Sequence, residues 1–200
     1  MSGPSIQNSL RQEAPTLSVG LLTAGMMALG SEVQLLERAG IKLVHFDVMD
    51  GCFCPMLTFG PPFIKGVKTS LFKDVHLVIQ EPLDKLEAYA AAGADIITIH
   101  VEACRHPNRV LQALKQIPNA REPDRGILRG LALNPGTPVE AAEPLLEDLD
   151  LRFSLNQLPH VESAMGEIRD QGIHPPVVGR DLPPHRCLHP AAYPERSMAL

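Results

Sequence analysis

The sequence predicts an α/β fold of the TIM (β/α)₈ barrel type, and three observations favour it. From Leu17 onward, apolar and β-branched segments alternate with helical segments at a steady spacing. Polar residues able to do chemistry recur at the C-terminal ends of successive expected strands, where such a barrel carries its active site. No Gly-x-Gly-x-x-Gly follows the first strand, which argues against a dinucleotide-binding doubly wound sheet, the other fold compatible with the alternation.

The expected strands are short runs rich in valine, isoleucine and leucine. Because these runs are apolar on both faces, they indicate a parallel sheet that helices cover. In chain order the strands are Leu17–Leu22, Leu43–Val48, Val75–Ile79, Ile96–Val101, Leu131–Leu133 and, as a sixth, Leu149–Leu155.

A helical segment follows each of the first five strands, so that about six βα units are recognisable. Glycines at positions 40, 93 and 130 stand where helices give way to strands, as helix-ending and turn positions require. The expected helices are Glu32–Ala39, Pro61–Leu71, Leu83–Ala92, Val110–Ile117 and Val139–Leu146.

The 200 residues suit one domain with an uneven organisation. We expect an irregular or disordered segment over residues 1–16, the barrel portion over 17–155, and a divergent proline-rich tail over 156–200 with one helix at Val161–Gln171. A complete barrel takes roughly 250 residues, so the barrel is predicted to be incomplete. Its unpaired strand edges predict self-association into a homo-oligomer, a tail that covers them, or poor solubility.

The composition excludes several classes of partner. A net charge of −5 provides no basic field for nucleic acid, and 4% aromatic content without tryptophan provides no stacking platform. With no secretory signal or membrane-spanning run, we expect a cytoplasmic protein that acts on a small molecule. Its four cysteines, Cys52, Cys54, Cys104 and Cys187, are expected to be free thiols, with metal binding by Cys52 and Cys54 as an alternative.

Three polar residues lie within otherwise apolar strands and predict a metal site. Residues two apart in a strand share a face, so His45 and Asp47 enter one environment, and His76 comes from the next strand. A carboxylate removed from water needs a compensating cation or hydrogen-bond donors. Two imidazoles and one carboxylate suit a divalent metal such as Zn, Fe, Mn or Co. The alternative is a hydrogen-bonded Asp–His pair, with His76 unrelated.

His100 and Glu102 alternate in the same way on the fourth strand. They are interpreted either as support for the site and contact with substrate, or as a hydrogen-bonded core pair.

Several segments carry a resemblance to a known family. With these segments in order, the chain from about Ser18 to about Leu151 resembles the ribulose-phosphate 3-epimerase family, a branch of the ribulose-phosphate-binding barrels. The segments are His45-Phe-Asp-Val-Met-Asp-Gly51, Thr58-Phe-Gly-Pro-Pro62, Asp74-Val-His-Leu77, Ala91-Ala-Gly-Ala-Asp-Ile-Ile97, His100-Val-Glu-Ala103 and Leu133-Asn-Pro-Gly-Thr-Pro138.

The resemblance implies a metal-dependent isomerase of carbohydrate metabolism that inverts C3 of a ketose phosphate through an enediolate, with a pentulose of the pentose phosphate pathway favoured. It implies that His45, Asp47 and His76 bind the metal and that Asp47 is the acid/base on one face of the substrate. His76 and Met49 would contact the substrate.

The chain also departs from the family pattern. No Asp-Gly-Gly, which carries the family's second acid, occurs in the sequence, and the glycine-rich phosphate loop after the sixth strand is absent. Gly20 stands where relatives have a serine, and Cys52 where many have a histidine. These departures leave a second hypothesis open, that the chain is a catalytically impaired or non-catalytic metal-binding remnant of such an epimerase.

Overall fold

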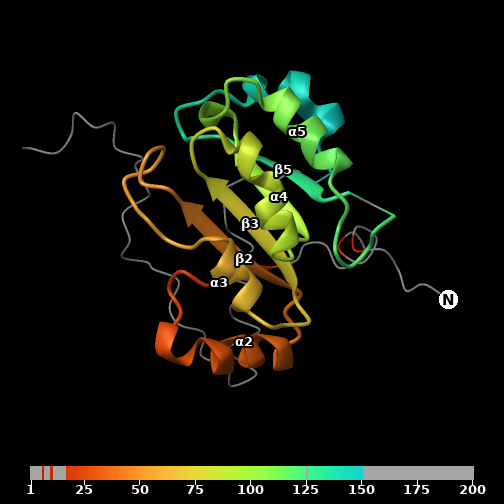
Figure 1. The fold of residues 1–200 in the computed structure, drawn as a ribbon. Helices are drawn as coiled ribbons and strands as arrows, with labels where there is room; N and C mark the ends of the chain where they lie inside the picture. The colour runs from red at the N-terminus through yellow and green to blue at the C-terminus, as the bar shows by residue number, and fades with distance from the viewer. Residues whose placement is uncertain (1–5, 7–9, 11–16, 125, 151–200) are drawn as a thin grey trace, which may run out of the picture.

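The computed structural model describes residues 6, 10, 17–124 and 126–150, and these contain one sheet of five parallel strands (Figure 1). The strands lie side by side in the order in which they occur along the chain. A doubly wound sheet reverses its strand order at a switch point, whereas a barrel does not, so the order confirms a partial TIM-type barrel. The strands are β1 Ser18–Gly20, β2 Leu43–Met49, β3 Phe72–Val78, β4 Ile96–His100 and β5 Leu128–Ala132.

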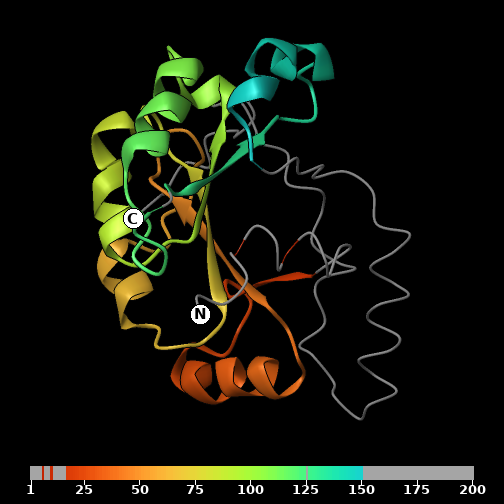
Figure 2. The ribbon, with the colours of Figure 1, turned by 90° about the vertical axis from the view of Figure 1, so that its right-hand side faces the viewer.

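The connections between strands carry α-helices and shorter 3₁₀ turns. Figure 2 shows α3, α4 and α5 along one face of the sheet, as the crossovers of parallel strands require. The α-helices are α2 Leu29–Arg38, α3 Pro61–Gly66, α4 Leu86–Ala91 and α5 Pro107–Gln116. The 3₁₀ segments are η1 Met26–Ala28, η2 Pro82–Lys85, η3 Val101–Ala103 and η4 Val139–Asp148.

The main core lies between the sheet and the helices. Alternate strand residues such as Phe46, Val75 and Ile97 are fully buried there. A second, smaller cluster occupies the opposite face of the sheet at the N-terminal ends of the strands, where Ile6 and Leu10 pack with Leu43, Ile96 and Leu128. The C-terminal half of that inner face is therefore left to polar side chains.

Several elements differ from the sequence expectation. Strand β3 and helices α2 and α5 each begin three residues earlier than expected, and the helix expected over Val139–Leu146 is the 3₁₀ segment η4. Helix α3 ends at Gly66 rather than Leu71, because Val67 adopts an extended conformation with ψ of 104°. Strand β5 begins three residues before the expected Leu131, because the charge of Arg129 that interrupts the apolar run is paired: Arg129 Nε donates to Asp150 Oδ2 at 2.8 Å.

The expected sixth strand lies almost wholly outside the described residues, as do the proline-rich tail and its helix. Asp150 is the last described residue, and its N–H donates to the carbonyl of Arg129 at 3.1 Å, along the edge of β5.

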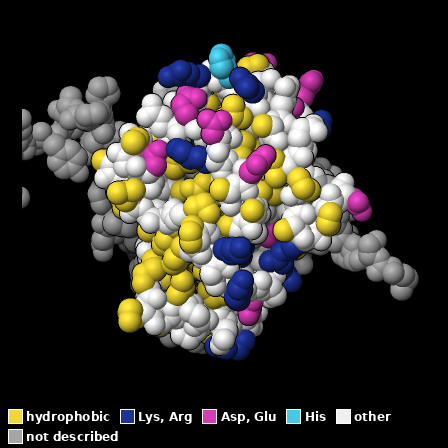
Figure 3. Space-filling view, viewed as in Figure 1, with side chains coloured by type: hydrophobic (Ala, Val, Ile, Leu, Met, Phe, Trp, Pro, Cys, Tyr) yellow, Lys and Arg dark blue, Asp and Glu magenta, His cyan; other side chains and the backbone are white. Residues whose placement is uncertain are grey.

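No described helix is long and apolar enough to cross a membrane. On the face that the helices cover, basic and acidic side chains are interspersed with hydrophobic ones (Figure 3).

Candidate metal centre

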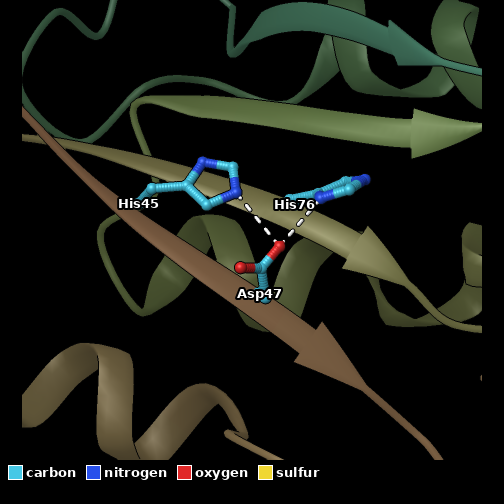
Figure 4. A group of neighbouring side chains, drawn as sticks. All are labelled: His45, Asp47 and His76. Atoms are coloured by element: carbon cyan, nitrogen blue, oxygen red, sulfur yellow. Dashed lines mark hydrogen bonds and ion pairs between the residues drawn. The ribbon is translucent and has the colours of Figure 1, made fainter. Parts of the chain in front are cut away.

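Strands β2 and β3 bring the three predicted metal ligands together. The register pairs Asp47 with His76, and alternation within β2 places His45 on the same face as Asp47. Figure 4 shows His45 and Asp47 on one strand and His76 on its neighbour, with both imidazoles directed at the carboxylate. The sequence interpretation that all three share one environment is therefore confirmed.

A single carboxylate oxygen joins the two imidazoles. Asp47 Oδ1 lies 3.1 Å from His45 Nε2 and 3.0 Å from His76 Nδ1. One ligand atom from each residue lies within 4.8 Å of the others, and this is the one such group of histidine, cysteine or acidic residues among the described residues. The spacing fits a single divalent ion held by two nitrogens and one oxygen.

The electrostatics of the group suit a cation. Burial alone would lower the pKa of His45, but the hydrogen bonds and charges of Asp47 and Asp74 outweigh it and raise that pKa to about 10. Burial would raise the pKa of Asp47, but the hydrogen bonds and charges of His45 and His76 hold it well below its usual value. Positive charge is thus strongly stabilised at this point, and Asp47 is ionised at neutral pH.

The remaining nitrogen of His76 is buried and has no hydrogen-bond partner in the described part of the chain. A buried donor or acceptor without a partner costs on the order of 1–3 kcal/mol. The site is therefore not a fully satisfied core network, which argues against the alternative of a merely structural Asp–His pair.

Sequence reasoning missed Asp74 and Ser18. Asp74 Oδ2 lies 2.7 Å from His45 Nδ1 and accepts a hydrogen bond from the Ser18 hydroxyl at 2.8 Å. The signal was present, because Asp74 interrupts an apolar strand two residues before His76 and so faces the same way. Only the register of β1, β2 and β3 shows which ring it serves.

His100 and Glu102 contact each other, and they lie beside the group formed by His45, Asp47 and His76, here called the metal group. The ring of His100 stacks on that of His76 with centroids 4.9 Å apart, and the ring of Phe53 lies 5.2 Å from that of His100 at a tilt of 50°. Glu102 accepts a hydrogen bond from the Asn134 N–H at 2.7 Å and lies 3.3 Å from His100 Nδ1. The pair therefore supports the ring of His76 and links β4 to the turn after β5.

Hydrogen bonds hold the loop after β2 at the C-terminal ends of β2 and β3. Asp50 accepts hydrogen bonds from the N–H groups of Cys52, Phe53 and Gln80, as expected of a turn-capping residue. Met49 is mostly buried, and its N–H is bonded to the Thr58 hydroxyl at 2.9 Å. Contact of Met49 and His76 with substrate stays a prediction.

The described cysteines are Cys52, Cys54 and Cys104, and their sulfurs are thiols rather than disulfide sulfurs, as expected. None belongs to the metal group. Cys187 lies outside the described residues.

Comparison with known proteins identifies relatives of this chain. The model of the ribulose-phosphate 3-epimerase family matches residues 16–156. The chain is 43% identical to ribulose-phosphate 3-epimerase of Bacillus subtilis over 133 residues, which cover 66% of this chain and 58% of the relative. It is 46% identical to the enzyme of the same name from Rhodobacter capsulatus over 140 residues, which cover 68% and 57%.

A plant protein shows the same relation. The chain is 35% identical over 164 residues to the chloroplastic ribulose-5-phosphate-3-epimerase of Arabidopsis thaliana, covering 77% of this chain and 56% of the relative. The matched region thus spans less than two thirds of the length of these relatives. The residues that the family model matches, 16–156, include β1 to β5 with His45, Asp47 and His76.

Proposed function

The chain belongs to the ribulose-phosphate 3-epimerase family, and from this we propose that it is an isomerase that inverts C3 of a ketose phosphate. The favoured reaction is the conversion of ribulose 5-phosphate to xylulose 5-phosphate. The observation that carries the proposal is the convergence of His45, Asp47 and His76 at the C-terminal ends of parallel strands, where a barrel binds its substrate.

The two oxygens of Asp47 are suited to different tasks. Oδ1 faces both imidazoles, whereas no hydrogen bond to Oδ2 is found among the described residues. The Asp47 side chain is 26% exposed, so a small molecule can approach this residue. We assign Oδ1 to the metal group and Oδ2 to removal of the C3 proton, which leaves an enediolate in the substrate.

His45, Asp47 and His76 would hold a divalent cation. When bound, such a cation would polarise the substrate ketone and stabilise the negative charge of the enediolate. Imidazole and carboxylate ligands accept Zn²⁺, Fe²⁺, Mn²⁺ and Co²⁺ alike, so the identity of the metal is left to experiment.

Inversion also needs an acid on the opposite face of the substrate. The sequence contains no Asp-Gly-Gly, the pattern that carries the second acid in the family. This observation favours a second candidate function, an impaired epimerase in which Asp47 removes and returns the proton on one face only.

Proton exchange separates the two candidates. The full chain, loaded in turn with each of the four metals, is incubated with ribulose 5-phosphate in D₂O, with C3 deuteration followed by NMR and xylulose 5-phosphate by a coupled assay. Deuteration with inversion supports the epimerase, and deuteration without inversion supports the impaired enzyme. Failure to exchange the C3 proton with any of the metals would exclude both catalytic functions.

A further inference from the structure

A second carboxylate lies behind the metal group, and the proposed reaction leaves it without a role. Asp74 on β3 is 2% exposed, and its Oδ2 contacts both His45 Nδ1, at 2.7 Å, and the Ser18 hydroxyl, at 2.8 Å. Its other oxygen is buried without a partner among the described residues. A carboxylate at this depth is costly unless a charge or several donors compensate it, so its position calls for an explanation.

The geometry fixes the His45 ring from both sides. An imidazole has one nitrogen on each side, and in His45 Nδ1 faces Asp74 while Nε2 faces Asp47 at 3.1 Å. The contact with Asp74 is the shorter of the two. The register of β2 and β3 places Asp74 directly opposite His45, so the contact depends on strand pairing and not on a flexible loop.

From this geometry we propose that Asp74, aided by Ser18, is a positioning residue for metal binding. Its carboxylate accepts the Nδ1–H of His45, which keeps the lone pair on Nε2 and directs it at the position that Asp47 and His76 share. The inference rests on the proposed metal site and adds to it a residue that the ligand set does not include.

The charges are consistent with this role. The two carboxylates nearest the group, Asp47 and Asp74, together supply two negative charges, which balance a divalent cation when both imidazoles are neutral. His76 lacks the same support, because its outer nitrogen has no partner in the described chain. Asp74 therefore acts on one of the two histidines, and its loss should weaken metal binding without abolishing it.

The test measures metal affinity, which needs no turnover. For Asp74→Asn, the Zn²⁺ dissociation constant from chelator competition should rise about 10- to 100-fold. In the Zn²⁺-loaded protein the two ¹⁵N resonances of His45 should also shift, because a neutral amide accepts the Nδ1–H more weakly than a carboxylate does. Asp95→Asn is the matched control, since Asp95 is equally buried, at 1% exposed, and contacts Lys73 N–H and Arg121 instead. It should leave both readouts unchanged.

Ser18→Ala provides a milder variant that keeps the charge. It removes one hydrogen bond to Asp74 and should weaken Zn²⁺ binding several-fold. If Asp74→Asn does not fold, Ser18→Ala decides, and unchanged affinity with unchanged His45 resonances overturns the inference. The same result in a folded Asp74→Asn also overturns it.

The two proposals fail separately. A chain whose Zn²⁺ affinity depends on Asp74 but which does not exchange the C3 proton overturns the epimerase proposal and supports this inference. A chain that exchanges the C3 proton, but whose Zn²⁺ affinity is unchanged by Asp74→Asn, supports the epimerase proposal and overturns this inference.

Discussion

The imidazole of His76 lies against that of His100, with the ring planes 24° apart. Burial and the neighbouring charge of His76 lower the pKa of His100 to about 4. An unfolded chain has a histidine pKa near 6.5, so between pH 6.5 and 4 the unfolded state binds more protons than the folded state. The contribution of His100 to the free energy of unfolding is therefore present above pH 6.5 and is lost as pH falls through about 4.

Urea denaturation between pH 4 and 8 tests this contribution. In the wild type, protonation of His100 should lower the free energy of unfolding by on the order of 3 kcal/mol between pH 6.5 and 4. Replacing His100 by Gln should remove this loss, so that the free energy of unfolding of the variant depends less on pH. His106 is exposed, and His106→Gln is the matched control. Identical slopes for wild type and His100→Gln would contradict the prediction.

Asp47→Asn should lower the rate of C3 deuteration by about 10²- to 10⁴-fold, because the amide cannot accept the proton. The variant should also bind metal more weakly, since one ligand is changed. Exchange measured by NMR in D₂O checks the first effect and metal analysis the second. Asp84 is an exposed acid on η2, and Asp84→Asn should behave as wild type. Wild-type exchange by Asp47→Asn would remove this residue from the reaction.

Metal binding should release a proton at neutral pH. With a pKa raised to about 10, His45 is protonated in the metal-free protein at pH 7 and must lose a proton to become a ligand. Apparent affinity should therefore increase with pH from 6 to 8. Titration calorimetry in buffers of different ionisation enthalpy should give close to one proton released per ion. A heat that does not depend on the buffer would show that His45 is already neutral.

Leu10→Ala should destabilise the fold by roughly 2–5 kcal/mol, the usual cost of truncating a buried leucine. Leu10 is 6% exposed and packs in the second, smaller cluster at the N-terminal ends of β2, β4 and β5. The midpoint of urea denaturation measures the effect. Leu57 is 81% exposed, and Leu57→Ala should change the midpoint little. Equal midpoints for the two variants would contradict the packing of Leu10 at this end of the sheet.

The parts of the site that the sequence predicted are those carried by local patterns. Strand β2 alternates Val44, Phe46 and Val48 outward with two polar residues inward, and this period of two fixes their common face without knowledge of any neighbour. The position of His76 on β3 followed from a single histidine within another apolar run. Local alternation was therefore enough to predict that His45, Asp47 and His76 lie together.

The parts that were missed depend on partners distant in sequence. Arg129 breaks the pattern of β5, and its charge is accommodated by Asp150 twenty-one residues later. Asp74 contacts a ring 29 residues earlier and a hydroxyl 56 residues earlier. No local pattern identifies such partners, because they depend on strand register and on which distant segments the fold brings together.

All three proposed metal ligands come from one βαβ unit, between residues 45 and 76. A contiguous stretch of coding sequence thus specifies the whole ligand set. A change confined to the sequence after β3 therefore leaves all three residues in place, so the candidate ligand set is encoded independently of the strands that follow it.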